Sequence, residues 1–151
     1  MIRDMKSLKI LSLVALLAAL LVGCEKEPVA GDNSPIIGEW ELVEWNNETP
    51  EFNVYISFDK DGSFEIYQQV WSFDYELFTG SYTVSGDILT GTYADGKKWA
   101  SGYKFSVADG VLTLYSQEDQ VVESRYQTCT IPEEIKAEAT TTRSSEVVPF
   151  L

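Results

Sequence analysis

The sequence predicts an all-β domain of eight short antiparallel strands, either an up-and-down barrel or a sandwich, with the closed barrel preferred. Runs of alternating apolar and polar residues recur through the middle of the chain, as expected of strands with one buried face. Turn signals, several of them Asp-Gly pairs, separate these runs, and such pairs supply the positive φ of tight hairpins. Closure into a barrel removes the exposed edges that favour aggregation.

The expected strands follow one another with little sequence between them. In the second, Val54, Ile56 and Phe58 share one face, and in the sixth Trp99 and Tyr103 share another. The eight expected strands are Gly38–Trp45, Asn53–Phe58, Ser63–Val70, Gly80–Val84, Ile88–Tyr93, Lys98–Val107, Val111–Tyr115 and Val121–Cys129.

Composition excludes several classes of function. The chain has 151 residues, a net charge of −13, two cysteines and no histidine, which suits one ordinary domain. Without histidine there is no Ser-His-Asp triad and no imidazole zinc ligand. The excess of carboxylates repels nucleic acid. We therefore expect no nucleic-acid partner, no metal and no cofactor.

The N-terminal segment reads as a cleaved leader. Arg3, Lys6 and Lys9 precede an almost wholly apolar run from Ile10 to Val22, the pattern of a signal peptide. The run is shorter than the roughly 20 residues that span a bilayer as a helix. Its end, Leu21-Val22-Gly23-Cys24, resembles a bacterial lipobox. This resemblance implies cleavage before Cys24, lipidation of its thiol and attachment to a membrane.

The chain therefore divides into four segments. Residues 1–23 are the expected lipoprotein signal peptide, 24–35 a flexible linker rich in turn formers, 36–131 the barrel and 132–151 a C-terminal tail. Within the tail we expect a short helix after Pro132 and a flexible stretch from 140 to 145. The apolar end, 147–151, either folds back on the barrel as a clasp or contacts a partner.

The residues after the lipid-bearing cysteine bear on location. Glu25-Lys26-Glu27 mixes lysine with carboxylates and looks like the acidic export tags of some gut-bacterial lipoproteins. The expected location is the bacterial outer membrane, lipid-anchored and facing the cell surface; a solvated tether on an inward-facing anchor is the alternative.

Several residues together carry a family resemblance. Gly38-Glu39-Trp40 looks like the Gly-x-Trp opening of lipocalins, and Arg125 occupies the position of their basic residue that packs across that tryptophan. With the lipobox, the order of hairpins and the ending Val148-Pro149-Phe150-Leu151, the chain resembles the lipocalin-like lipoproteins of anaerobic gut bacteria. The resemblance implies an eight-stranded lipocalin-like barrel, most of whose family members lack an assigned activity.

Trp40 and Arg125 also have a physical interpretation of their own. A large indole at the closed end of a barrel excludes water, and a guanidinium on its face gains a cation–π attraction of about 0.5 to 2 kcal/mol. We expect Gly38, Trp40 and Arg125 to close the barrel structurally, without a catalytic role.

Candidate ligand contacts concentrate in an aromatic segment with a broken alternation. Trp71, Phe73, Tyr75 and Phe78 lie there, and at a barrel mouth such rings bind a sugar or an apolar ligand. Alternatively they plug the barrel, since eight strands enclose little more than their own side chains.

Other candidate chemistry has simpler explanations. Asp59-x-Asp61-Gly62 lacks the spacing of an EF-hand calcium loop and reads as a hairpin turn. Glu39 and Glu41 share one strand face and are expected on the outer surface rather than as a glycosidase pair. Cys129 is expected to be a buried, inert thiol.

The sequence thus predicts a lipid-anchored, lipocalin-like binding or accessory protein of the cell envelope, not an enzyme. The expected partners are the membrane, through the lipid on Cys24, and a small apolar or sugar ligand. A protein-binding or inhibitor module with a filled barrel is the alternative.

Overall fold

The computed structural model describes residues 34–151; the predicted leader and Cys24, the predicted lipidation site, lie outside them. A 3-10 turn, η2 (Ser34–Ile36), leads into the first strand. The strands of the barrel are β1 (Gly38–Trp45), β2 (Asn53–Phe58), β3 (Ser63–Gln69), β4 (Glu76–Ser85), β5 (Ile88–Tyr93), β6 (Tyr103–Ala108), β7 (Val111–Ser116) and β8 (Glu123–Thr128). The chain ends with α2 (Glu133–Glu138), the two-residue strand β9 (Thr140–Thr141) and an extended segment.

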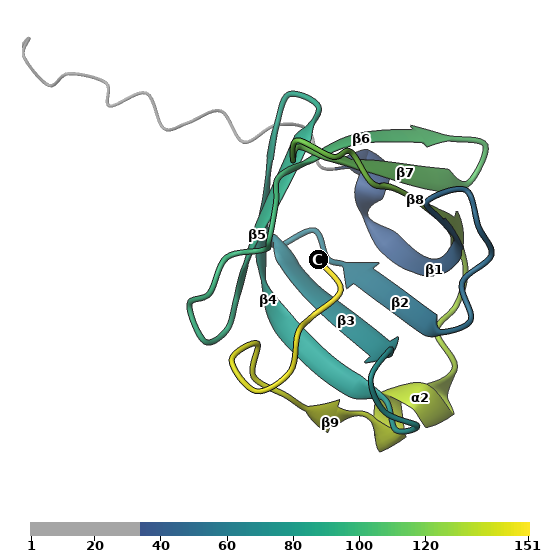
Figure 1. Cartoon of the computed structure of the whole chain (residues 1–151), viewed down its shortest axis with the longest axis vertical. Helices are drawn as coiled ribbons and strands as arrows, with labels where there is room; N and C mark the ends of the chain where they lie inside the picture. The colour runs from purple at the N-terminus through teal and green to yellow at the C-terminus, as the bar shows by residue number, and fades with distance from the viewer. Residues whose placement is uncertain (1–33) are drawn as a thin grey trace, which may run out of the picture.

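The eight long strands form a closed antiparallel barrel, as predicted (Figure 1). Each pairs with its neighbours in sequence, and β1 pairs with β8. The turn between β6 and β7 shows how the sequence sets a hairpin: Asp109 has φ 52° and Gly110 φ 74°, the two positive values that a type I′ turn requires. Where β5 meets β6 only two residue pairs join the strands.

The interior of the barrel is densely packed with apolar and aromatic side chains. Alternation places Val54, Ile56 and Phe58 of β2 inside, and all three are buried, as expected. Phe64 packs edge to face on Trp99, with ring centroids 5.1 Å apart.

Five predicted strands have different bounds in the structure, and the starts of two of them shift by four or five residues. Strand β4 begins at Glu76 rather than Gly80, and β6 begins at Tyr103 rather than Lys98. Between β5 and β6 the chain folds back on β5, with Trp99 N donating to Gly91 O at 3.0 Å. The alternation predicted from Lys98 onward therefore spans this loop as well as the strand.

The C-terminal tail wraps around the barrel. From the end of β8 it crosses the outer face, where Ile131 and Ile135 of the α2 region bury against Tyr67. It then pairs in parallel with β4 through β9, with Glu76 opposite Thr140. In Figure 1 the yellow end of the chain runs from β9 back across the barrel to the point marked C. The stretch 140–145, expected to be flexible, is thus held by backbone hydrogen bonds, among them Thr142 N to Leu77 O at 2.9 Å.

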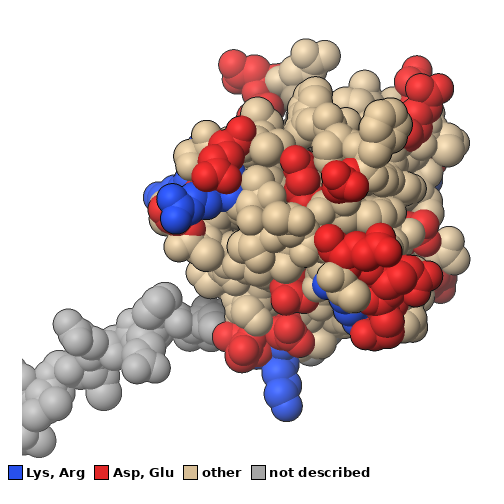
Figure 2. Space-filling model, turned by 90° about the horizontal axis from the view of Figure 1, so that it is seen from below, with Lys and Arg blue, Asp and Glu red and all other residues tan. Residues whose placement is uncertain are grey.

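Two further observations concern the membrane and the surface charge. Within the described residues no helix has the length and apolar character needed to cross a bilayer. Figure 2 shows one face of the molecule, on which acidic side chains greatly outnumber basic ones.

Candidate ligand-binding sites

The two ends of the barrel differ in the length of the connections between strands. At one end β2 and β3, β4 and β5, and β6 and β7 are joined by tight turns; at the other the connections are longer. We call this second end the mouth. Of the aromatic residues predicted to contact a ligand, Trp71, Phe73 and Tyr75 belong to the β3–β4 connection at the mouth, and Phe78 belongs to β4.

Trp71 and Phe73 lie at the rim of the mouth and are exposed to solvent. Their exposed fractions are 67% and 98%. They line an open cleft of about 360 Å³, hereafter the rim cleft, whose other walls are residues 51–53 and 69–70. Asn53 Nδ2 donates to Gln69 Oε1 at 3.1 Å across one wall. The rim cleft therefore combines two exposed aromatic rings with amide groups.

Tyr75 and Phe78 lie elsewhere. Tyr75 packs on the outer face with Tyr55, ring centroids 6.3 Å apart, next to the cluster under α2. Burial there raises its pKa. Phe78 is 1% exposed and belongs to the interior core. The four residues predicted to contact one ligand thus occupy different parts of the fold, and only Trp71 and Phe73 line the rim cleft.

The end of the tail fills the mouth itself. Leu151 is 2% exposed and belongs to the interior core. The ring of Phe150 packs against Trp45 and Phe52, with centroids 6.2 and 5.8 Å away. Of the two roles open for residues 147–151, the structure therefore shows the clasp.

A buried side chain on β3 holds this clasp. Gln68 is fully buried; its Oε1 accepts from Phe150 N at 2.8 Å and its Nε2 donates to Val148 O at 3.1 Å. The hydroxyl of Tyr93 donates to Leu151 O. Gln68 Nε2 also donates to Glu76, so removing the tail would leave Gln68 Oε1 and the Tyr93 hydroxyl without these partners.

The predicted closure by Trp40 and Arg125 is wrong in one respect. Trp40 is buried and its Nε1 donates to Ile36 O at 2.8 Å. Arg125, however, points outward and lies 3.7 Å from Glu44. It alternates with the inward Ser124 and Tyr126, so its guanidinium lies on the opposite face of the sheet from the indole. Gly38 begins β1 with φ 136°.

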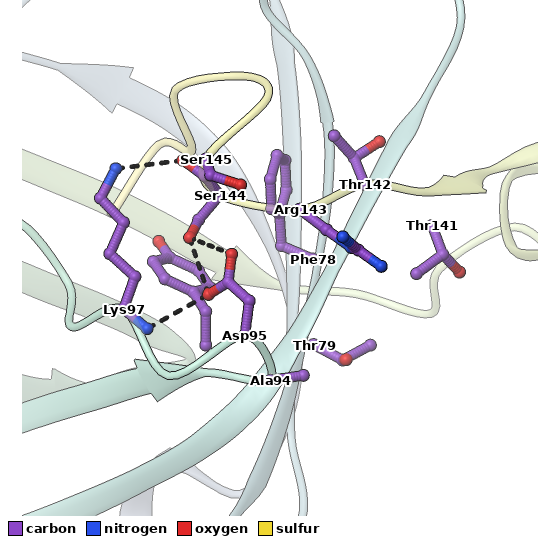
Figure 3. Close-up of a pocket in the computed structure, with 11 residues that line it drawn as sticks. Phe78, Thr79, Ala94, Asp95, Lys97, Thr141, Thr142, Arg143, Ser144 and Ser145 are labelled. Carbon is purple, nitrogen blue, oxygen red and sulfur yellow. Dashed lines mark hydrogen bonds between the residues drawn. The ribbon is translucent and has the colours of Figure 1, made fainter.

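A second cleft lies where the sheet forks. Strand β4 pairs with β5 from Gly80 onward but with β9 at Glu76 and Leu77. Between the two partners a cleft of about 610 Å³ opens, hereafter the fork cleft (Figure 3). It is lined by Phe78, Thr79, Tyr93, Ala94, Asp95, Lys97, Thr141, Thr142, Arg143, Ser144 and Ser145.

Hydrogen bonds join the β5–β6 loop to the tail across the fork cleft. Ser144 Oγ donates to Asp95 at 2.7 Å, and Lys97 Nζ donates to Ser144 O at 3.1 Å. The bonds from Ser144 and from Lys97 N lower the pKa of Asp95, so this carboxyl is ionised at neutral pH. Sequence reasoning missed Asp95, Lys97, Arg143 and Ser144 as a group, because they come from segments separated by about fifty residues.

The carboxylates of β1 have structural roles. Glu39 Oε1 accepts from Lys136 Nζ at 2.8 Å, and its Oε2 accepts from Ile131 N at 2.7 Å. Glu41 accepts a hydrogen bond from Tyr55. Glu39 thereby fastens the tail to β1 and is not simply a solvated surface charge.

Within the described part of the chain the free cysteine is Cys129. Partial burial and the nearby Glu41 and Glu39 raise the pKa of Cys129 to about 11, so its thiol is protonated at neutral pH and a poor nucleophile. Residues 34–151 contain no group of three or more acidic, cysteine or histidine side chains placed to hold a metal.

The comparisons with known proteins agree with this fold. Residues 36–114 match the lipocalin-like domain family, which is more than half of the chain, and the protein belongs to that family. A crystal structure of a lipocalin-like protein from Bacteroides uniformis matches with a TM-score of 0.50 and 18% identity, covering 63% of this chain and 99% of that one. A search of curated proteins found no match. Members of this family typically bind ligands without catalysing reactions.

Proposed function

We propose that this is a lipid-anchored binding protein of the bacterial cell envelope, tethered to the outer membrane through Cys24 and displayed at the cell surface. It binds a small sugar or apolar ligand at the rim cleft rather than inside the barrel. The leader, the lipobox-like end of that leader and membership of a ligand-binding family support the proposal.

One observation supports the rim cleft as the ligand-binding site. The interior is packed and Leu151 occupies the mouth, yet Trp71 and Phe73 keep large aromatic faces in solvent beside the rim cleft. Exposed aromatic rings bury much apolar surface at low side-chain entropy when a ligand covers them. Amides such as those of Asn53 and Gln69 both donate and accept, as sugar hydroxyls require.

Calorimetric titration of the full chain in detergent tests this assignment, with maltotriose as the sugar probe and laurate as the apolar probe. We expect saturable binding of one probe, weakened about tenfold or more in a Trp71→Ala/Phe73→Ala variant because two contact surfaces are removed. Val121→Ala, an exposed apolar residue on another mouth loop, is the matched control and should bind normally. Binding unchanged in the double variant would place the site elsewhere.

A protein-binding module is the second candidate, and one feature favours it. Trp71 Nε1 donates to Val148 O at 2.9 Å, and Val148 is 66% exposed. With Phe73 these residues form an apolar surface at the rim that suits a protein contact. A photo-crosslinker at position 73 in living cells would then give one discrete adduct that Trp71→Ala abolishes, and neither maltotriose nor laurate would bind.

A further inference from the structure

The fork cleft has a definite structural cause. Strand β5 leaves β4 after Ala94 N donates to Thr79 O at 2.8 Å, and the tail leaves it after Thr142 N donates to Leu77 O. Phe78 and Thr79 form the floor between the two departing chains. The fork cleft therefore follows from the pairing of the sheet and shares no lining residue with the rim cleft.

The fork cleft is lined by two basic side chains, although the chain as a whole is strongly acidic. The lysines and arginines of the described residues are Lys60, Lys97, Lys98, Lys104, Arg125, Lys136 and Arg143. Ion pairs occupy Lys104, Arg125 and Lys136. Of the remaining four, Lys97 and Arg143 both line the fork cleft. The fold therefore gives the fork cleft two positive charges against the one negative charge of Asp95, in a chain that carries a large negative charge. Figure 3 shows the Lys97 and Arg143 side chains on opposite sides of Ser144.

Arg143 is available to an incoming anion. Among residues 34–151 its side chain has no ion-pair partner, and Figure 3 shows it extending among the residues that line the fork cleft. Guanidinium binds carboxylates through two parallel hydrogen bonds. Lys97 Nζ makes one hydrogen bond, to Ser144 O, which leaves two of its three hydrogens for a ligand.

The rest of the lining suits hydroxyl groups. Thr79, Thr141 and Ser145 each bring a hydroxyl that both donates and accepts, and the hydroxyl of Thr142, which donates to Thr140 O, can accept. Asp95 is ionised and accepts hydrogen bonds from Ser144, and its remaining lone pairs can accept from a ligand hydroxyl. A carboxylate inside the cleft disfavours ligands with many negative charges. The cleft volume of about 610 Å³ lies in the range of small-molecule sites.

We propose that the fork cleft binds a sugar acid, a monosaccharide with one carboxylate and several hydroxyls. The ligand carboxylate pairs with Arg143, and the ligand hydroxyls bond to the threonine, serine, Asp95 and Lys97 side chains. This site is independent of the proposed rim-cleft function.

The experiment is a calorimetric titration of the full chain in detergent with D-glucuronate, D-glucose and sulfate. We expect saturable binding of glucuronate and at least tenfold weaker binding of the other two, since glucose lacks the charge and sulfate the hydroxyl array. Arg143→Gln should weaken glucuronate binding about tenfold, and Lys97→Gln less, because lysine is the secondary contact.

Controls separate this site from general charge effects and from the rim cleft. Lys98→Gln removes a neighbouring cation that does not line the cleft and should bind glucuronate normally. The Trp71→Ala/Phe73→Ala variant should as well. Melting curves establish that each variant is folded. Absence of saturable glucuronate binding, equal binding of glucose or sulfate, or equal weakening by Lys98→Gln would overturn the proposal.

Discussion

The indole of Trp99 lies against the α-carbon of Gly91 on β5, so a side chain at position 91 has no room. A Cβ atom there would lie 2.1 Å from Trp99 Cε2, and Trp99 is buried. We predict that Gly91→Ala lowers the free energy of unfolding by about 1–3 kcal/mol or more, because overpacking forces the indole or the strand to shift. Urea denaturation followed by tryptophan fluorescence measures the change.

Gly102 provides the matched control for that substitution. A Cβ atom at Gly102 would meet its nearest neighbour, Thr90 Cγ2, at 3.5 Å, an ordinary contact. Gly102→Ala should therefore change stability little. Equal effects of the two substitutions would mean that Trp99 does not pack on Gly91 in solution.

The alternation of buried and exposed residues along β8 determines which way Arg125 faces. Tyr126 is the one large apolar residue of β8 and is fully buried, so its neighbour in sequence must face outward. The sequence alone therefore predicts an outward Arg125, against the family resemblance that places its side chain across Trp40. Gln68 is the opposite case: nothing in its own strand indicates that a polar residue facing inward will find the backbone of residues 148–150.

At the scale of elements, the strands and the short helix after Pro132 were predictable, whereas the contacts that the tail makes with the barrel were not. β1, β2 and β5 have the expected bounds, because alternation and turn residues are local signals. The contacts of α2, β9 and the clasp join residues far apart in sequence, so no local pattern reports them. The fork cleft could not be predicted for the same reason: it exists only because β9 takes part of the edge of β4.

The fastening of the tail to β1 has a pH dependence. Burial raises the pKa of Glu39, but hydrogen bonds from Lys136 and Ile131 N and the charge of Lys136 lower it more, so its pKa lies below the ordinary value. Its contribution is therefore complete above the unfolded-state pKa, about 4.3, and is lost as the pH falls through the folded-state pKa. We predict that Glu39→Gln costs about 1 kcal/mol at neutral pH and that the difference from wild type disappears in acid.

Urea denaturation of both proteins at several pH values checks this prediction. Glu138→Gln is the control, since Glu138 is exposed on α2 and forms no ion pair in the described residues; it should have little effect at any pH. A Glu39→Gln deficit that persists unchanged at low pH would mean that the carboxylate charge is not what holds the tail.

At the scale of the whole molecule, the acidic charge of the chain bears on the proposed attachment to a membrane. A net charge of −13 gives the chain no attraction to anionic lipid surfaces. Figure 2 shows few basic side chains on the face in view. The proposed attachment therefore depends on covalently bound acyl chains, each buried methylene contributing about 0.8 kcal/mol. Both cysteines offer a thiol, but that of Cys129 is partly buried against the barrel and has a pKa of about 11.

Cys24 should accordingly be the one acylated residue. In cells fed a labelled fatty acid we expect Cys24→Ala to abolish incorporation and to leave the leader uncleaved, seen as the precursor mass, while Cys129→Ala is labelled and cleaved normally. If the lipid-anchored form is displayed at the surface as proposed, added protease should digest the wild-type protein on intact cells and should leave Cys24→Ala protected inside. Normal labelling of Cys24→Ala would refute the anchor. A labelled wild-type protein protected from protease would instead retain the anchor and place it on an inward-facing leaflet.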